Sequence, residues 1–379
     1  MPFQDVNNGL YNQMVAGLGQ SPGSFVLLQP CNPVLDNNAL WNHYFNLIPP
    51  VSLVFNNLLS TGAQFFDNYS ALNSALQSAA EKTYENKIPQ AIRDEFENFI
   101  QNRATTPSLS QYPALFRNWA FLKHPAIANA GASALAAAIL DPITAAQLRL
   151  MPYQGDPAAD PPIPPKAPDW DEDFTKLKAQ LSSGVRRSFS YKQSNISTDV
   201  SQTWSHGGSS GFFGLWGDSN SSSSQSITFS QSDFSVDASF GHVIAFSPVP
   251  GSWFSSAALG IAFRNKDKAP WLPGNPVTWD TAFNPAKGNL ARFLINLIVV
   301  DTMVVTVKSF AVFSQNDQTQ IQTHSGGGLW PFYTSNSGNG ASTNFTFDDQ
   351  RHMTVTITSL PGVPIVLGAN VLPIDQFIT

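Results

Sequence analysis

The spacing of apolar residues changes near residue 185, and this change limits the folds open to the 379-residue chain. Apolar residues recur every three or four positions in residues 65–79 and again in 88–100, which predicts amphipathic helices. Apolar and polar residues alternate in 234–240 and 353–357, which predicts half-buried strands. The run 293–300 is apolar on both faces and predicts a fully buried strand. The chain is therefore expected to be helical first and β-rich second.

A proline-rich stretch separates these two parts. Residues 156–168 read DPAADPPIPPKAP, a composition that favours an extended, semi-rigid spacer. Acidic residues at 169–173 followed by lysines predict a short helix just after it, since this order suits the helix dipole. We therefore expect a mostly α-helical lobe over residues 1–155, a linker over 156–168 and a β-rich domain over 169–379.

Two segments of the β-rich part carry the same motifs in the same order, residues 185–251 and 305–368. Each has Ser-Phe, Gln-x-x-Ser/Thr-His, Gly-Gly, Leu-Trp, Ser-Asn-Ser and then Ser-x-x-Phe, which begins seven residues after Ser-Asn-Ser in both segments. A solenoid needs at least three repeats, so two copies favour a pseudo-symmetric β unit. The predicted fold class is α+β: a helical N-terminal lobe followed by an antiparallel β-sandwich made of two weakly repeated hairpin units.

The chain carries little charge for its size. Charged residues make up 12% of it, against about 25% in ordinary soluble domains, and Ser, Asn, Gln and Thr replace them. Neutral hydroxyls and amides are cheaper to desolvate than ions, so this surface favours contact with a second copy, a glycan, a cell surface or a membrane. The net charge of −6 and the lack of a basic stripe argue against nucleic acid as a partner.

Aromatic residues in predicted loops are candidates for surface or membrane contact, because apolar loop tips are costly unless they insert into something. The alternative is that they fill the protein's own core. Charge-poor segments near them, residues 195–205 and 219–226, have the composition of membrane-inserting hairpins. The candidate contact residues are Phe212, Phe213, Trp216, Trp271, Trp330, Phe332 and Tyr333.

His206 and His324 occupy matching positions in the two segments and are candidate ligand or metal residues. Neither has a second histidine or a carboxylate within five residues, so a structural histidine at a hairpin end is the simpler interpretation. Cys31 is the only cysteine, which excludes an intrachain disulfide and a cysteine-based zinc site. No cofactor is expected.

The sequence offers little to an enzyme hypothesis. The glycine-rich loops lack the following helix and lysine of a phosphate loop, and the adjacent carboxylates Asp348 and Asp349 do not oppose each other across a cleft. No G-x-S-x-G elbow occurs. These features favour a non-enzymatic protein.

The N-terminus lacks a basic segment followed by an apolar one, so we expect no Sec signal, and no apolar run is long enough to predict a transmembrane helix. Release or extracellular action would then use a non-Sec route. The leading hypothesis is a toxin-like, cell-surface-binding or pore-forming protein that acts as a homo-oligomer through its Ser-rich β domain. The alternative is a self-assembling structural protein that forms a shell, fibre or inclusion. A third hypothesis is a carbohydrate-binding module or hydrolase that uses the loop tryptophans.

Overall fold

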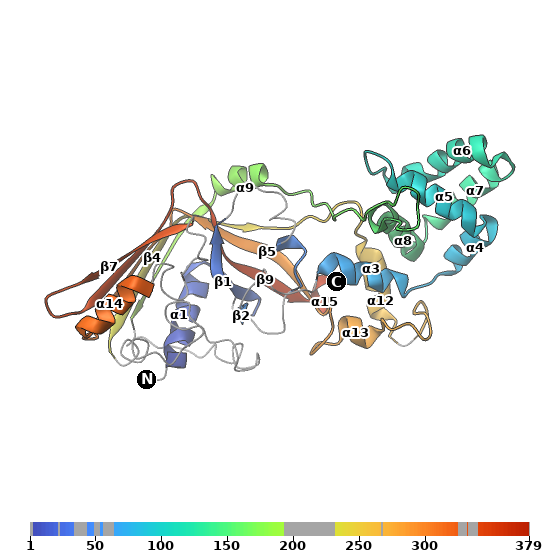
Figure 1. Ribbon diagram of the computed structural model, residues 1–379. Helices are drawn as coiled ribbons and strands as arrows, with labels where there is room; N and C mark the ends of the chain where they lie inside the picture. Colours follow the sequence, from blue (N-terminus) through green and yellow to red (C-terminus); the bar gives the residue numbers. More distant parts are fainter. Residues whose placement is uncertain are drawn as a thin grey trace. The chain divides into compact units, whose positions relative to one another are not determined.

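The chain forms two compact units, each assembled from segments far apart in the sequence (Figure 1). The computed structural model describes residues 3–21, 23–33, 44–48, 54–55, 64–192, 232–266, 268–324, 332 and 340–378. The sheet unit comprises Met1–Gly62, Glu172–Pro248 and Arg292–Leu372, and the helical unit comprises Ala63–Asp171, Val249–Ala291 and Pro373–Thr379. Helices combined with an antiparallel sheet confirm the α+β class.

The borders of these units differ from the predicted domain borders. Met1–Gly62 belongs to the sheet unit although we expected it in the helical lobe, and Val249–Ala291 belongs to the helical unit. The proline-rich stretch also lies within the helical unit. Asp156 and Ile163 each donate a backbone hydrogen bond to the other, at 2.8 and 2.9 Å. This local pairing folds the stretch back on itself, which its composition alone does not reveal.

Within the described residues, nine strands form one sheet. Its order is β2-β1-β9-β5-β4-β6-β8-β7, and β3 pairs with β4. Neighbours pair antiparallel in β1–β9, β3–β4, β4–β5, β4–β6, β6–β8 and β7–β8, whereas β1 and β2 are parallel. The strands are β1 (Phe25–Pro33), β2 (Val54–Phe55), β3 (Val185–Lys192), β4 (Phe234–Phe246), β5 (Arg292–Asp301), β6 (Val304–Ser309), β7 (Ala341–Phe347), β8 (Met353–Ser359) and β9 (Ile365–Pro373).

Strands β5 and β6 follow one another along the same side of β4. His242 pairs with Asp301 on β5, and Ser239 pairs with Val304 on β6, while β3 occupies the other side of β4. Thr302 and Met303 interrupt the run, and Thr302 has a φ of 50°, in the left-handed region that non-glycine residues rarely adopt. The two strands therefore act as one long strand with an irregular step in it.

Helices cover the apolar face of this sheet. The described residues contain no second sheet that packs on it. Side chains of α1 (Phe3–Gly17) share one core with side chains of β1, β3–β6, β8 and β9, and Ile321 of α14 (Gln315–His324) joins the same core. Figure 1 shows α1 running beside the strands. On the part of the chain that the structure describes, the predicted sandwich of two sheets is not found, because helices supply the second layer.

The helical unit has a core rich in aromatic residues. Trp253 is fully buried, and its ring lies 5.1 Å from that of Phe66, 5.7 Å from that of Tyr69 and 5.4 Å from that of Trp170. A second cluster forms around Phe96 and its neighbours. The helices are α3 (Phe65–Ser74), α4 (Ala79–Lys87), α5 (Gln90–Gln101), η2 (Leu109–Gln111), α6 (Tyr112–Lys123), η3 (Pro125–Ile127), α7 (Ala128–Ala138), α8 (Pro142–Gln154), α12 (Ser256–Arg264), α13 (Trp279–Phe283) and α15 (Ile374–Phe377).

The described anchors of the predicted repeat do not lie in equivalent environments. Phe189 is buried on β3, whereas its counterpart Phe310 follows β6 and is 58% exposed. Gly251 lies in the helical unit, whereas its counterpart Gly362 lies in the sheet unit. The anchors between residues 193 and 231 are outside the described residues.

Candidate functional site

The open face of the sheet is lined by hydroxyl groups across five adjacent strands, β3, β4, β6, β8 and β7. Strand residues alternate between faces, so the pairing registers fix which side chains share this face. Ten of its fifteen side chains are serine or threonine, and three are charged. We call this set the hydroxyl face: Ser188, Ser190, Lys192, Ser235, Asp237, Ser239, Val304, Thr306, Lys308, Ser342, Asn344, Thr346, Thr354, Thr356 and Thr358.

The hydroxyl face is ordered in rows that cross the strands. One row runs Ser190, Asp237, Thr306, Thr356 and Asn344, each paired with the next across the sheet. Ser190 donates a 2.6 Å hydrogen bond to Asp237. Because neighbouring strands lie about 4.8 Å apart, the rows form a regular array of mostly neutral donors and acceptors. Such an array can contact water or another polar surface without burying unpaired charge.

The opposite face of the same strands is apolar and buried. Val236, Val305, Val307, Val355 and Ile357 are each 1% exposed or less. They belong to the core that α1 and α14 complete. The sheet is therefore amphipathic, with one neutral polar face and one apolar face.

Glycines let α1 lie very close to β3. A Cβ atom at Gly17 would lie 2.5 Å from the Cβ of Phe189, and one at Gly9 would lie 2.7 Å from the hydroxyl of Tyr191. Real side chains do not tolerate such distances, so larger residues at these positions would force the helix away from the strand.

A groove of about 480 Å³ opens on the hydroxyl face beside the step between β5 and β6. β3, β4 and the step itself supply its walls. The lining residues are Arg186, Arg187, Ser188, Ser239, Phe240, Gly241, His242, Thr302 and Val304. It contains both cations and hydroxyl donors, a combination that we call the cationic groove.

One carboxylate lies at the edge of the cationic groove. The Nδ1 atom of His242 is 2.8 Å from Oδ1 of Asp301, and the side chains are 36% and 23% exposed. An ionised carboxylate accepts hydrogen bonds only, so Nδ1 carries the proton of this bond and Nε2 is the nitrogen left for a ligand.

The two arginines of the groove differ in their surroundings. Arg186 and Arg187 are both exposed, and neither forms a salt bridge with any residue that the structure describes. The guanidinium of Arg187 also lies beside Gly19, just beyond the C-terminal end of α1, where the helix dipole favours a cation. Arg187 pairs with Phe240, so its side chain leaves the strand on the face that α1 covers, whereas Arg186 is on the hydroxyl face with Ser188. The chemistry of the groove suits anion binding, since it pairs donors and positive charge without a nucleophile activated by a base.

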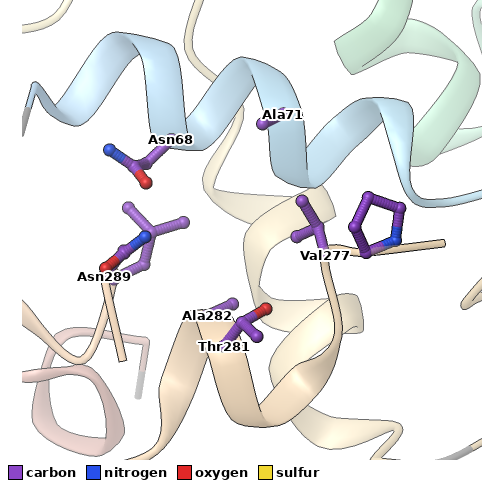
Figure 2. Close-up of a pocket in the computed structure, with 8 residues that line it drawn as sticks. Asn68, Ala71, Val277, Thr281, Ala282 and Asn289 are labelled. Carbon is purple, nitrogen blue, oxygen red and sulfur yellow. The ribbon is translucent and has the colours of Figure 1, made fainter. Parts of the chain in front are cut away.

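A second, smaller cavity lies in the helical unit between α3 and α13 (Figure 2). Its volume is about 200 Å³. Figure 2 shows the amides of Asn68 and Asn289 near one another on one side, with Val277 and Thr281 nearby. The Thr281 hydroxyl already bonds the backbone carbonyl of Thr278 at the start of α13, so it is held as part of a helix cap. No lining residue of this cavity is ionisable, which leaves it without acid–base chemistry.

Trp271 is not the open contact residue that its turn-rich surroundings predict. Its indole Nε1 donates a 3.2 Å hydrogen bond to the carbonyl of Ala262, and its ring packs edge-on against Phe283. Trp279 in the same cluster donates a 2.7 Å bond to the carbonyl of Phe263. Both indole nitrogens therefore bond carbonyls of α12, which fixes the two rings in the helical unit.

Phe332 is 1% exposed and stacks on Phe189 in the sheet core, and its role in surface contact stays a prediction. The alternative weighed for the loop aromatics, burial in the protein's own core, holds at this position. His324 is the last residue of α14 and does not lie at a hairpin end. The remaining predicted contact residues Phe212, Phe213, Trp216, Trp330 and Tyr333, together with His206 and the segments 195–205 and 219–226, lie outside the described residues.

The described residues contain no group of three or more His, Cys, Asp or Glu side chains placed to hold a metal ion. Among these residues no single helix has the length and apolar character to cross a membrane, although Pro125–Ala138 and Pro142–Gln154 meet both criteria as a pair bent by 113°. Comparisons with protein-family models, curated proteins and solved structures find no match to this chain. Inference about function therefore rests on the geometry described above.

Proposed function

We propose that this protein is a non-enzymatic, toxin-like protein whose sheet unit binds a cell surface and inserts β-hairpins into its membrane as a homo-oligomer. The observation that carries the proposal is the amphipathic sheet. A membrane-inserted hairpin needs one face that meets lipid and one that meets water. The strands β3, β4, β6, β8 and β7 already have such faces, with valines on one side and hydroxyls on the other.

The layer that covers the apolar face supports this reading. Two helices cover it, and the contact of α1 with β3 depends on the absence of side chains at Gly9 and Gly17. A helix can leave a sheet without breaking the hydrogen bonds between the strands, whereas a second sheet would bring its own extensive apolar interface. The apolar face would become available to lipid once α1 moves away. The predicted internal repeat is not needed for this proposal.

The test is dye release from liposomes, with the mass of the protein measured by light scattering in the same samples. We expect a monomer in buffer, and a larger oligomer together with dye release once lipid is present. Gly17→Val should lower the protein concentration needed for release several-fold, because its side chain would clash with Phe189 and loosen α1 by about 1–3 kcal/mol.

Two matched variants make this test specific to α1. Gly23→Ala should behave as the wild type, since the nearest atom to an added Cβ is 3.9 Å away. Gly131→Val introduces a comparable clash with Phe116, 2.3 Å from an added Cβ, but does so in the helical unit. It should destabilise the protein without promoting release. If no dye is released at any protein concentration or pH, the proposal is wrong.

Self-assembly into a shell, fibre or inclusion is a second candidate, favoured by the sheet edge at β7. Within the described part of the chain β7 has one neighbour, β8, and none of its seven residues is charged. Edge strands without charge are ready templates for pairing with another chain. This candidate requires large particles of uniform size without lipid, so the scattering measurement in buffer separates the two functions.

A further inference from the structure

We propose that the cationic groove beside the step between β5 and β6 binds a phosphomonoester group, carried either by a soluble phosphate ester or by the headgroup of an anionic lipid. This inference deepens the proposed function by naming the chemistry that the sheet unit would recognise at a surface. Only one part of the inference rests on the proposed function, namely that a lipid headgroup is the source of the phosphate.

Arg186 supplies the main attraction. It is exposed and forms no salt bridge with any described residue, in a chain whose net charge is −6. A guanidinium presents a planar fork of donors that matches two oxygens of a phosphate, and such charge-assisted bonds are about twice as strong as neutral ones. Arg186 lies on the same face as Ser188 and Ser239, so its fork is placed in the groove, whereas Arg187 pairs with Phe240 and its guanidinium lies beside Gly19 on the α1 side of the sheet.

The negative group at the groove does not outweigh Arg186 and His242 together. Asp301 is held 2.8 Å from Nδ1 of His242 by the pairing of these two residues between β4 and β5. With His242 neutral, the charge of Arg186 balances that of Asp301. When His242 is protonated, its charge compensates that of Asp301, and Nε2 becomes a further donor.

Three hydroxyls complete the set of donors. Ser188 and Ser239 are cross-strand partners between β3 and β4, and Thr302 projects from the step. The step exists because Gly241 lies opposite Thr302, where a Cβ atom would lie 2.7 Å from the Cβ of Thr302. The volume of about 480 Å³ lies within the range of small-molecule sites, about 300–1,000 Å³, and leaves room for a polyol on the phosphate.

The first measurement is isothermal titration calorimetry of the full chain with inorganic phosphate and with glycerol 3-phosphate. Arg186→Gln should weaken binding about tenfold, which corresponds to the loss of one charge-assisted hydrogen bond. Arg186→Lys keeps the charge but loses the fork, so it should fall between Arg186→Gln and the wild type. Arg117→Gln removes an equally exposed arginine on α6 of the helical unit and should leave binding unchanged.

Vesicle flotation separates the two sources of the phosphate. We expect the wild type to prefer phosphatidylcholine vesicles containing phosphatidic acid, a monoester, over those containing phosphatidylglycerol, a diester. Binding of glycerol 3-phosphate without any vesicle preference would support the site with a soluble ester as its ligand. Both binding modes should weaken as salt is added, because the partners are ions near a surface.

The inference is overturned if neither phosphate compound binds and phosphatidic acid has no effect, or if the Arg186 and Arg117 variants bind alike. Circular dichroism of each variant establishes that the fold is retained. Dye release from pure phosphatidylcholine vesicles keeps this outcome separate from the proposed function. If the protein releases dye from these vesicles but does not bind phosphate, only the phosphate-binding inference is overturned. If it binds phosphate but never releases dye, only the pore-forming function is overturned.

Discussion

The two units of this protein hold their carboxylates in different environments. In the helical unit, burial raises the pKa values of Glu81 and Glu97. In the sheet unit, the backbone N–H of His352 lowers the pKa of the exposed Asp348, and the hydroxyl face carries few charges. The comparison teaches that the pH dependence of folding should arise mainly in the helical unit, whereas the surface available for contact belongs to the sheet unit.

The largest expected effect tests whether the helical unit depends on its aromatic core. Trp253 is fully buried and donates a 2.8 Å hydrogen bond to the carbonyl of Asp169. Trp253→Ala should cost about 3–5 kcal/mol, because it leaves a large cavity and removes one of the two hydrogen bonds that the Asp169 carbonyl accepts, the other coming from the N–H of Gly251. Urea denaturation followed by circular dichroism measures the cost.

The control is Leu140→Ala, at a position of the same unit that is 82% exposed, where the change should stay within about 0.5 kcal/mol. Two transitions, with only one of them shifted by Trp253→Ala, would sharpen the comparison by showing that the units unfold independently. A cost below about 1 kcal/mol would contradict the role of Trp253 in the core.

Sequence patterns predicted most individual elements of both units because they depend on local spacing. The alternation in residues 234–240 and 353–357 corresponds to β4 and β8, and the apolar run 293–300 corresponds to β5. The period of three and four likewise marks α3 and α5. In these segments one face or both faces are buried, so the spacing of apolar residues in the sequence reveals the burial pattern.

The assembly of the elements was not predictable in the same way. β1 pairs with β9, more than 300 residues away. The hydroxyl face exists only because four registers bring Ser and Thr positions onto one side. The cationic groove was not predicted either, because the pairing of β3 with β4 is what brings Arg186 and His242 together. A cue was present in the sequence, a pair of arginines at the start of a predicted strand in a chain poor in charge. The predicted contact residues drew attention to aromatic side chains instead.

A smaller effect is expected from pH, and it tests the different environments of the carboxylates. Burial, with smaller contributions from Asp94 and Asp156, raises the pKa of Glu97 from 4.5 to about 7, and Arg93 opposes these effects. The folded state therefore binds more protons than the unfolded state between these two pH values, so the free energy of unfolding falls as pH rises from about 4.5 to 7. We expect a loss of about 1–2 kcal/mol across this window, allowing for partial exposure.

Glu97→Gln should remove most of that pH dependence when unfolding is measured across the window. Asp349→Asn removes an exposed carboxylate of the sheet unit and should leave the dependence in place. If the free energy of unfolding of the wild type instead rises over this pH range, Glu97 is ionised in the folded state at little cost. The difference between the carboxylates of the two units would then not hold.

The smallest expected effect concerns the hydroxyl face itself. Thr306 on β6 lies directly across from Asp237 on β4 and from Thr356 on β8. Thr306→Lys places a positive charge opposite Asp237, whereas Thr306→Glu places a second negative charge there. Because charges that face each other across strands contribute about 0.2–1 kcal/mol, the lysine variant should be the more stable of the two by roughly that amount. Urea denaturation in low salt measures the difference, and in 1 M salt it should largely disappear, since the Debye length is then about 3 Å. A difference that persists in high salt would mean that the face is covered by other parts of the chain, and the sheet unit would then lose the open polar surface that sets it apart from the helical unit.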